Sequence, residues 1–252
     1  MLGLGFGPVL AGTISTCLPG PLTATYLIDI ALLIICLGCV WYAPETKSSA
    51  GTLRLKMRKP YVPHEIRALF VPAAIAGFAG FAVMGLFNAA VSGVVIEQMG
   101  IHNRIAIGCI VLTIFMGSAA GQSTQHLLSS RSRLPVGCLL LAMGMVVIGI
   151  SIYYAHLIAL IVGAVVAGIG QGIAFRAGLG EITQQSPAEH RAGAAAMFFI
   201  VIYIAISLPV VGLGLAAQVL GVGMAGALFS GVIAVLALIA MIAIVREYRH
   251  IP

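Results

Sequence analysis

Charged residues are scarce in this sequence. Asp, Glu, Lys and Arg together make up 8% of the 252 residues, whereas a soluble domain contains about 25%. Apolar residues make up 61% and the mean hydropathy is +1.12, which would leave a soluble domain too little polar surface to face water. Disorder is excluded as well, because disordered chains combine low hydropathy with high net charge. The composition therefore predicts a polytopic membrane protein.

Motifs for enzymatic, metal or nucleotide chemistry are also missing. The six histidines show no metal-ligand spacing such as H-E-x-x-H, and there is no phosphate-binding motif. The five cysteines are scattered. The pair Cys36 and Cys39 lies in an apolar run, without the βαβ context of a redox site. We therefore expect no enzyme, no bound metal or cofactor, and no direct use of ATP.

Eight long apolar runs follow one another along the chain. A helix needs about 20 apolar residues to cross a bilayer core of about 30 Å, and these runs do not alternate as the strands of a membrane barrel do. Turn-forming segments such as Leu18-Pro19-Gly20-Pro21 separate them. The sequence therefore predicts an all-α polytopic membrane protein with about eight transmembrane helices, approximately at residues 1–16, 22–42, 66–98, 103–128, 134–154, 156–183, 191–220 and 222–245.

Lys and Arg residues gather on one side of the predicted helices. Only Arg104 lies at the opposite side, and only Arg176 lies well inside a helix. By the positive-inside rule this pattern predicts that both termini lie in the cytoplasm. We expect a multi-pass protein of the plasma membrane, or of the inner membrane in a bacterium. The net charge of +6 thus indicates membrane orientation and not a nucleic-acid partner. The predicted cytoplasmic residues are Lys47, Arg54, Lys56, Arg58, Lys59, Arg67, Arg131, Arg133, Arg191, Arg246 and Arg249.

A run of small residues lies near the start of the chain. It reads Gly3-Leu4-Gly5-Phe6-Gly7-Pro8-Val9-Leu10-Ala11-Gly12. Glycines at helical spacing let two helix backbones approach closely, and a proline inside a helix bends it. The run resembles the antiporter signature of the major facilitator superfamily, G-x-x-x-G-P-x-x-G-G, with alanine in place of one glycine. The residues that match or replace signature positions are Gly3, Gly7, Pro8, Ala11 and Gly12.

The resemblance extends along the chain. Pro44-Glu45-Thr46-Lys47 is similar to the end of the family's sixth helix, and the basic segment that follows is similar to its central loop. The resemblance implies that residues 1–42 are the last two helices of an N-terminal bundle. Residues 43–66 would be the central cytoplasmic loop, and residues 67–252 the C-terminal six-helix bundle. The family's first four helices would be absent, so we expect a truncated chain, for which another chain could supply the missing helices.

The signature is typical of proton-coupled drug exporters in this family. The resemblance therefore implies secondary active transport of a small molecule by alternating access, with proton entry exchanged for export of a drug-like substrate. Two alternatives remain open. One is an importer of a sugar or metabolite with the same fold. The other is a non-transporting membrane scaffold or remnant fragment, because the family's pathway lies between two bundles.

Charged residues inside the predicted helices are candidates for function. Placing Arg176 at the bilayer centre costs about 2.5–3.5 kcal/mol. It either serves anionic substrate groups or a carboxylate latch, or it reaches the headgroups with its long side chain. Asp29 is the candidate for proton coupling, since burial raises the affinity of a carboxylate for protons; the alternative is a residue that reaches water. Glu181 lies where Arg191 could pair with it.

Neutral polar and aromatic residues complete the predicted pathway. The resemblance implies that the family's seventh and tenth helices, which correspond to the predicted helices at residues 66–98 and 156–183, line the substrate pathway. Hydrogen bonds between helices are the alternative for each single residue, at about 0.6 kcal/mol on average. Together with Arg176, the candidate pathway residues are Asn88, Gln171, Phe175, Tyr203 and Ser207.

Overall fold

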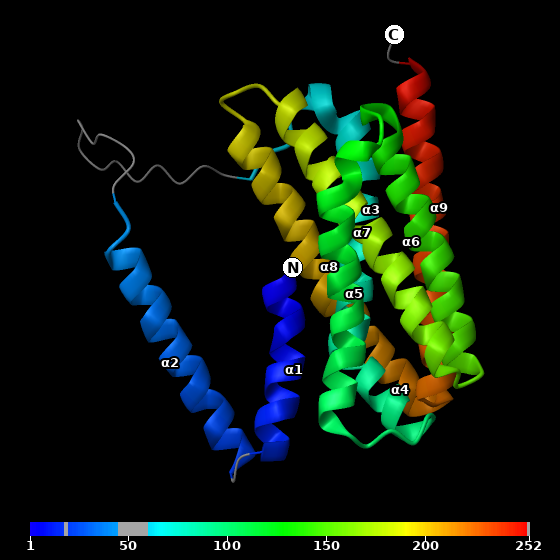
Figure 1. Cartoon of the computed structure of the whole chain (residues 1–252). Helices are drawn as coiled ribbons and strands as arrows, with labels where there is room; N and C mark the ends of the chain where they lie inside the picture. The colour runs from blue at the N-terminus through cyan, green and yellow to red at the C-terminus, as the bar shows by residue number, and fades with distance from the viewer. Residues whose placement is uncertain (18–19, 45–59, 251–252) are drawn as a thin grey trace.

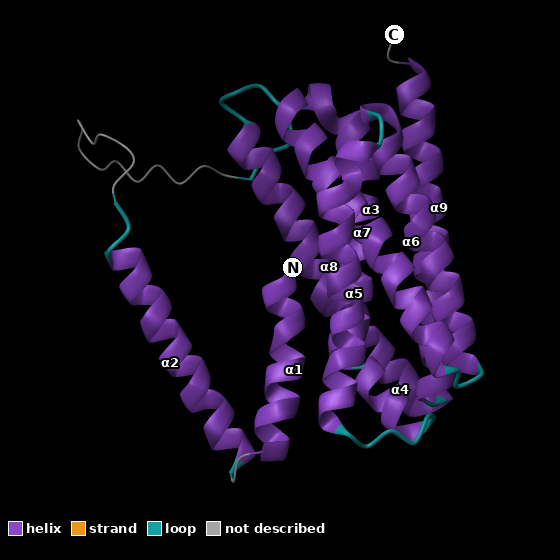
Figure 2. Cartoon of the chain, in the orientation of Figure 1, coloured by secondary structure: helices purple, strands orange, loops and turns teal. Residues whose placement is uncertain are grey.

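The structure is a computed structural model that describes residues 1–17, 20–44 and 60–250. These residues form helices joined by short connections (Figure 2). Residues 45–59, most of the predicted loop 43–66, lie outside the described residues. In chain order the elements are α1 (Leu2–Cys17), α2 (Pro21–Trp41), the short 3₁₀ helix η1 (His64–Ile66), α3 (Arg67–Ala89), α4 (Val91–Glu97), α5 (Arg104–Thr124), η2 (Gln125–Leu127), α6 (Ser130–Tyr153), α7 (Leu157–Gln185), α8 (Arg191–Leu220) and α9 (Val222–His250).

Seven helices in the described part of the chain are long and apolar enough to cross a membrane. They include α2, α3 and α5 to α9, and the prediction of an all-α polytopic membrane protein is confirmed. The remaining predicted span is α1, which is apolar but has only 16 residues. At about 1.5 Å per residue, such a helix extends about 24 Å, less than the bilayer core of about 30 Å.

The helix predicted over residues 66–98 is divided in the structure. A bend at Ala90, with φ −115° and ψ −30°, separates α3 from α4. The hydrogen bonds continue across it, since the Ala90 N–H donates to Leu86 and the Ala90 carbonyl accepts from Val94. The chain therefore changes direction at this point at little cost in hydrogen bonding, and α4 covers one end of the bundle (Figure 1).

Most of the described helices form one bundle. Buried residues are densest on α3, which packs against α7, α8 and α9. Two core clusters run along the bundle, one around Phe87 and Phe115 and the other around Phe70 and Phe198. α1 lies against α5, while α2 stands apart from the bundle with its apolar residues exposed (Figure 1).

Glycines allow α7 to lie close to both α5 and α6. A Cβ atom added at Gly168 or Gly172 would collide with backbone carbonyl oxygens of α5. One added at Gly170 would collide with the backbone of α6. Close approach of this kind replaces the hydrophobic driving force that helices lack inside a membrane, because dispersion contacts grow as backbones approach. The small residues of α7 thus join α5, α6 and α7 into one unit.

The contact between α1 and α5 also depends on small residues. A Cβ atom at Gly12 would lie 2.5 Å from the carbonyl oxygen of Arg104, and one at Gly108 would lie 2.6 Å from that of Pro8. Gly3 and Gly7 have no heavy atom within 4 Å of such a Cβ. Of the signature residues, Pro8 and Gly12 therefore face α5, whereas Gly3, Gly7 and Ala11 lie on the exposed side of α1.

Replacing Gly12 by valine is expected to detach α1 from α5, because the new Cβ meets a backbone atom that cannot move aside. The matched variant Gly7→Val has the same change in helix propensity but meets open space. Amide hydrogen exchange of the purified protein in nanodiscs measures whether α1 has detached from α5. We expect faster exchange over residues 2–17 in Gly12→Val only, and equal exchange in the two variants would contradict the observed contact.

Candidate functional site

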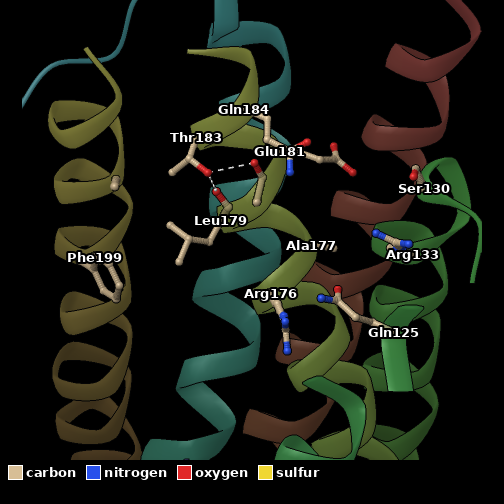
Figure 3. A pocket seen from close by; sticks show the side chains of 12 residues that line it. Gln125, Ser130, Arg133, Arg176, Ala177, Leu179, Glu181, Thr183, Gln184 and Phe199 are labelled. Carbon is tan, nitrogen blue, oxygen red and sulfur yellow. Dashed lines mark hydrogen bonds between the residues drawn. The ribbon is translucent and has the colours of Figure 1, made fainter. Parts of the chain in front are cut away.

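A cavity of about 570 Å³ opens between α6, α7, α8 and η2. It lies at the basic end of the bundle, defined here as the end that carries Arg133, Arg191 and Arg246. Figure 3 shows side chains from these separate elements reaching toward it. Its lining residues are Gln125, Ser130, Arg133, Arg176, Ala177, Leu179, Gly180, Glu181, Thr183, Gln184, Ala195 and Phe199.

Two arginines contribute positive charge to the cavity. The Nε of Arg133 donates to the carbonyl oxygen of Leu128 at 3.1 Å. The Nη1 of Arg176 donates to the carbonyl oxygen of Gln122 at 2.9 Å. In the part of the chain that the structure describes, neither guanidinium has a carboxylate oxygen within 4.0 Å. Each arginine is thus fixed by one main-chain acceptor and keeps further N–H donors for other partners.

The acidic residue of the cavity is held by another helix. The hydroxyl of Tyr248, on α9, lies 2.6 Å from each carboxylate oxygen of Glu181 and donates to them. The predicted pairing of Glu181 with Arg191 is wrong. Arg191 instead donates its Nε to the carbonyl oxygen of Ser186, because the chain turns back between α7 and α8 and brings the guanidinium over the last turn of α7.

Gln125 occupies the junction between α5 and η2. It is 9% exposed, and its side-chain oxygen has no hydrogen-bond partner. A buried polar atom without a partner costs about 1–3 kcal/mol, so this position is unfavourable unless a partner arrives. Sequence analysis did not select Gln125 or Arg133 for the pathway. Both lie at helix ends, where polar residues usually indicate only a turn or the membrane boundary.

Two of the predicted pathway residues lie at or beside this cavity. Arg176 lines it directly. The ring of Phe175 lies 6.2 Å from that of Phe198 and 6.4 Å from that of Phe199, which is itself a lining residue. The same ring packs edge-on against Phe81 at 5.1 Å. Phe175 therefore supports the cavity wall and links α7 to α3 and α8.

Gln171 lies deeper in the bundle. It is 1% exposed, and its Oε1 accepts a hydrogen bond of 2.5 Å from the hydroxyl of Ser118 on α5. The same hydroxyl accepts a bond of 3.2 Å from the Nε2 of Gln122, whose carbonyl holds Arg176. The Nε2 of Gln171 has no partner. A polar chain thus runs from the core between α5 and α7 to the cavity.

The other predicted residues are not brought to the cavity. Asn88 is exposed in the last turn of α3. Tyr203 and Ser207 are exposed on α8, where the Ser207 hydroxyl donates to the Tyr203 carbonyl at 3.1 Å. Asp29 is exposed on α2, away from the bundle (Figure 1). These four side chains lie on open faces, and their predicted roles stay predictions.

The histidine, cysteine and acidic side chains are spread along the described residues 1–17, 20–44 and 60–250. No three His, Cys, Asp or Glu residues in these ranges come close enough together to hold a metal ion. The cavity presents guanidinium, amide, hydroxyl and carboxylate groups, which bind a ligand by hydrogen bonds and charge.

Comparison with known proteins gives one positive result. None of the curated proteins compared with the chain matches it. Residues 1–208 match the Major Facilitator Superfamily. The match covers both α1, with its small residues, and most of the bundle that contains the cavity. The chain therefore belongs to the Major Facilitator Superfamily, whose members are secondary transporters.

Proposed function

We propose that the chain takes part in alternating-access export of a small molecule in exchange for protons, and that the cavity at the basic end is its cytoplasmic opening. The observation that carries this proposal is an open cavity of about 570 Å³ lined by charged groups of membrane-spanning helices. Binding sites for small molecules commonly measure about 300–1,000 Å³. The clustering of Lys and Arg at this end supports a cytoplasmic position.

The position of Arg176 supports a functional cavity. It lies nine residues before Gln185, the last residue of α7, which corresponds to a depth of about 14 Å. A charge in hydrocarbon costs several kcal/mol, and such residues usually face a water-filled space or a partner. Here the side chain lines the cavity and is held by a main-chain carbonyl of α5.

The packing of α7 supports motion as a unit. The close contacts of α7 with α5 and α6 join three helices, two of which form the cavity wall. Alternating access requires rigid groups of helices that rock against each other around a site. The contact of α1 with α5 through Gly12 and Gly108 is a surface on which two such groups could slide, as the signature implies.

Filling the cavity tests the proposal. A Cβ atom at Gly180, which lines the cavity, meets nothing within 4 Å, so Gly180→Phe is expected to fold normally and to obstruct the opening. Gly212→Phe, on α8 and also in open space, is the matched control. We expect everted vesicles with an acidic interior to accumulate at least one of two labelled probes, ethidium or 4-hydroxybenzoate. Gly180→Phe should abolish this accumulation and Gly212→Phe should keep it.

Collapse of the pH gradient with nigericin should also abolish accumulation, since proton flow drives it. Uptake into right-side-out vesicles, with none into everted ones, would instead support an importer. Unchanged transport in Gly180→Phe would remove the cavity from the pathway. Transport of neither probe in either type of vesicle would overturn the proposed function. Replacing Asp29 by asparagine tests its proposed role, because proton-driven transport should then be lost while substrate exchange without a gradient remains.

A further inference from the structure

The charges of the cavity do not balance. Its described lining contains Arg133 and Arg176 but only one acidic residue, Glu181. The hydroxyl of Tyr248 shares its one proton between both oxygens of that carboxylate and leaves its negative charge in place, so Glu181 offsets one of the two arginine charges. The described lining of the cavity therefore carries an excess of one positive charge.

Both arginines have N–H groups that their main-chain hydrogen bonds do not use. A guanidinium carries five N–H donors in a planar fork that fits an oxyanion in two-point fashion. Arg133 uses its Nε for the Leu128 carbonyl, and Arg176 uses Nη1 for the Gln122 carbonyl. These bonds fix the direction of each side chain, which lowers the entropy lost when a ligand binds. The remaining N–H groups belong to two different helices and line the same cavity.

Gln125 adds an acceptor to this pair of cations. Its side-chain oxygen is buried, lacks any partner and belongs to a residue of the cavity lining. Figure 3 shows the amide reaching into the space that the arginines border. A buried oxygen of this kind is satisfied by an O–H or N–H group. A ligand that suits the whole set thus carries an anionic group together with a hydrogen-bond donor.

We propose that the substrate is a small organic acid, whose carboxylate binds Arg133 and Arg176 and whose hydroxyl or amino group donates to Gln125. This inference rests on the proposed function and specifies its substrate class. The volume of about 570 Å³ admits such a molecule with room for a ring or a short chain. The alternative role for Arg176, reaching the headgroups, does not account for the second arginine or for the unpartnered amide oxygen.

The test uses matched probes with the full chain in everted vesicles. 4-Hydroxybenzoate has a carboxylate and one O–H donor, benzoate lacks the donor, and ethidium is a cation. We expect accumulation of 4-hydroxybenzoate at low concentration to fall at least tenfold in both Arg133→Gln and Arg176→Gln. Benzoate should be carried several-fold more slowly than 4-hydroxybenzoate. The control Arg249→Gln removes an exposed charge of α9 that lies outside the cavity lining, and it should transport normally.

The variants are first compared by thermal unfolding, so that loss of transport is scored only for variants that melt as the parent does. Arg176→Lys serves as a second variant, since it keeps the charge and loses the planar fork, and it should recover only part of the rate. Accumulation of ethidium without 4-hydroxybenzoate would overturn this inference and leave the proposed function standing. So would accumulation of 4-hydroxybenzoate that is indifferent to both arginines. Transport of neither probe would overturn both.

Discussion

Replacing Gly172 by valine is expected to prevent α7 from packing against α5 and to leave little folded protein. A Cβ atom at this position would collide with the carbonyl oxygen of Ser118 and lie 3.0 Å from the amide nitrogen of Gln122. Both are main-chain atoms within α5, so neither moves without shifting the helix itself. Overpacking typically costs about 1–3 kcal/mol even where side chains can adjust. We expect a loss at or above the top of that range.

The matched control is Gly180→Val on the same helix. A Cβ atom there meets no heavy atom within 4 Å, while the change in helix propensity is the same. Size-exclusion chromatography and thermal unfolding in detergent compare the two variants. Gly172→Val should elute largely as aggregate or melt at a much lower temperature, and Gly180→Val should resemble the parent. Similar melting of both variants would show that the two helices are not held at this distance.

The glycines of α7 allow close packing against two helices, α5 and α6. Gly168 and Gly172 are spaced by four residues and face α5, while Gly163 and Gly170 are spaced by seven and face α6. Both spacings return to the same side of a helix. The combination lets one helix approach two others closely, and a substitution on either side therefore disturbs the wall of the cavity.

The number and ends of the helices could be largely predicted from the sequence. Apolar length and turn residues determine them, and the predicted ends of α7 and α8 differ from the observed ones by at most two residues. The division at Ala90 was missed because its hydrogen bonds continue and no proline marks it. A bend of this kind comes from packing of α4 over the bundle end, which a linear sequence does not display.

The inward faces of the helices could not be predicted in the same way. Lipid tails are as apolar as a protein core, so a membrane helix shows no polar outer face to contrast with its buried one. Nothing in the sequence therefore distinguishes the placement of Tyr203 from that of Gln171, yet Tyr203 is 67% exposed and Gln171 is 1% exposed. Arg176 was identified because an intramembrane charge is costly whichever way it points. Gln125 needed the structure, since only the fold shows that its oxygen lacks a partner.

Replacing Ser118 by alanine is expected to destabilise the protein more than replacing its larger partner Gln171 by methionine. Loss of the serine hydroxyl leaves the Oε1 of a 1% exposed glutamine without a donor, while its Nε2 already lacks an acceptor. Leaving a buried polar group unpaired costs about 1–3 kcal/mol. Gln171→Met removes the unpaired Nε2 together with the Oε1 that Ser118 binds, and it keeps the Cβ and Cγ positions against which Gly80 packs. The serine left behind can bond to a carbonyl of its own helix.

A double-mutant cycle measures this asymmetry. We expect Ser118→Ala to lower stability by about 1–3 kcal/mol, and Ser118→Ala combined with Gln171→Met to recover most of that loss, since no buried amide then remains. Thermal unfolding of the four proteins in the same detergent gives the coupling. If the two substitutions instead lower stability additively, so that the double variant is less stable than either single variant, the hydrogen bond does not couple Ser118 to Gln171. If Gln171→Met melts like the parent but no longer transports, the polar chain between α5 and α7 serves transport and not stability, because its loss then affects the substrate pathway alone.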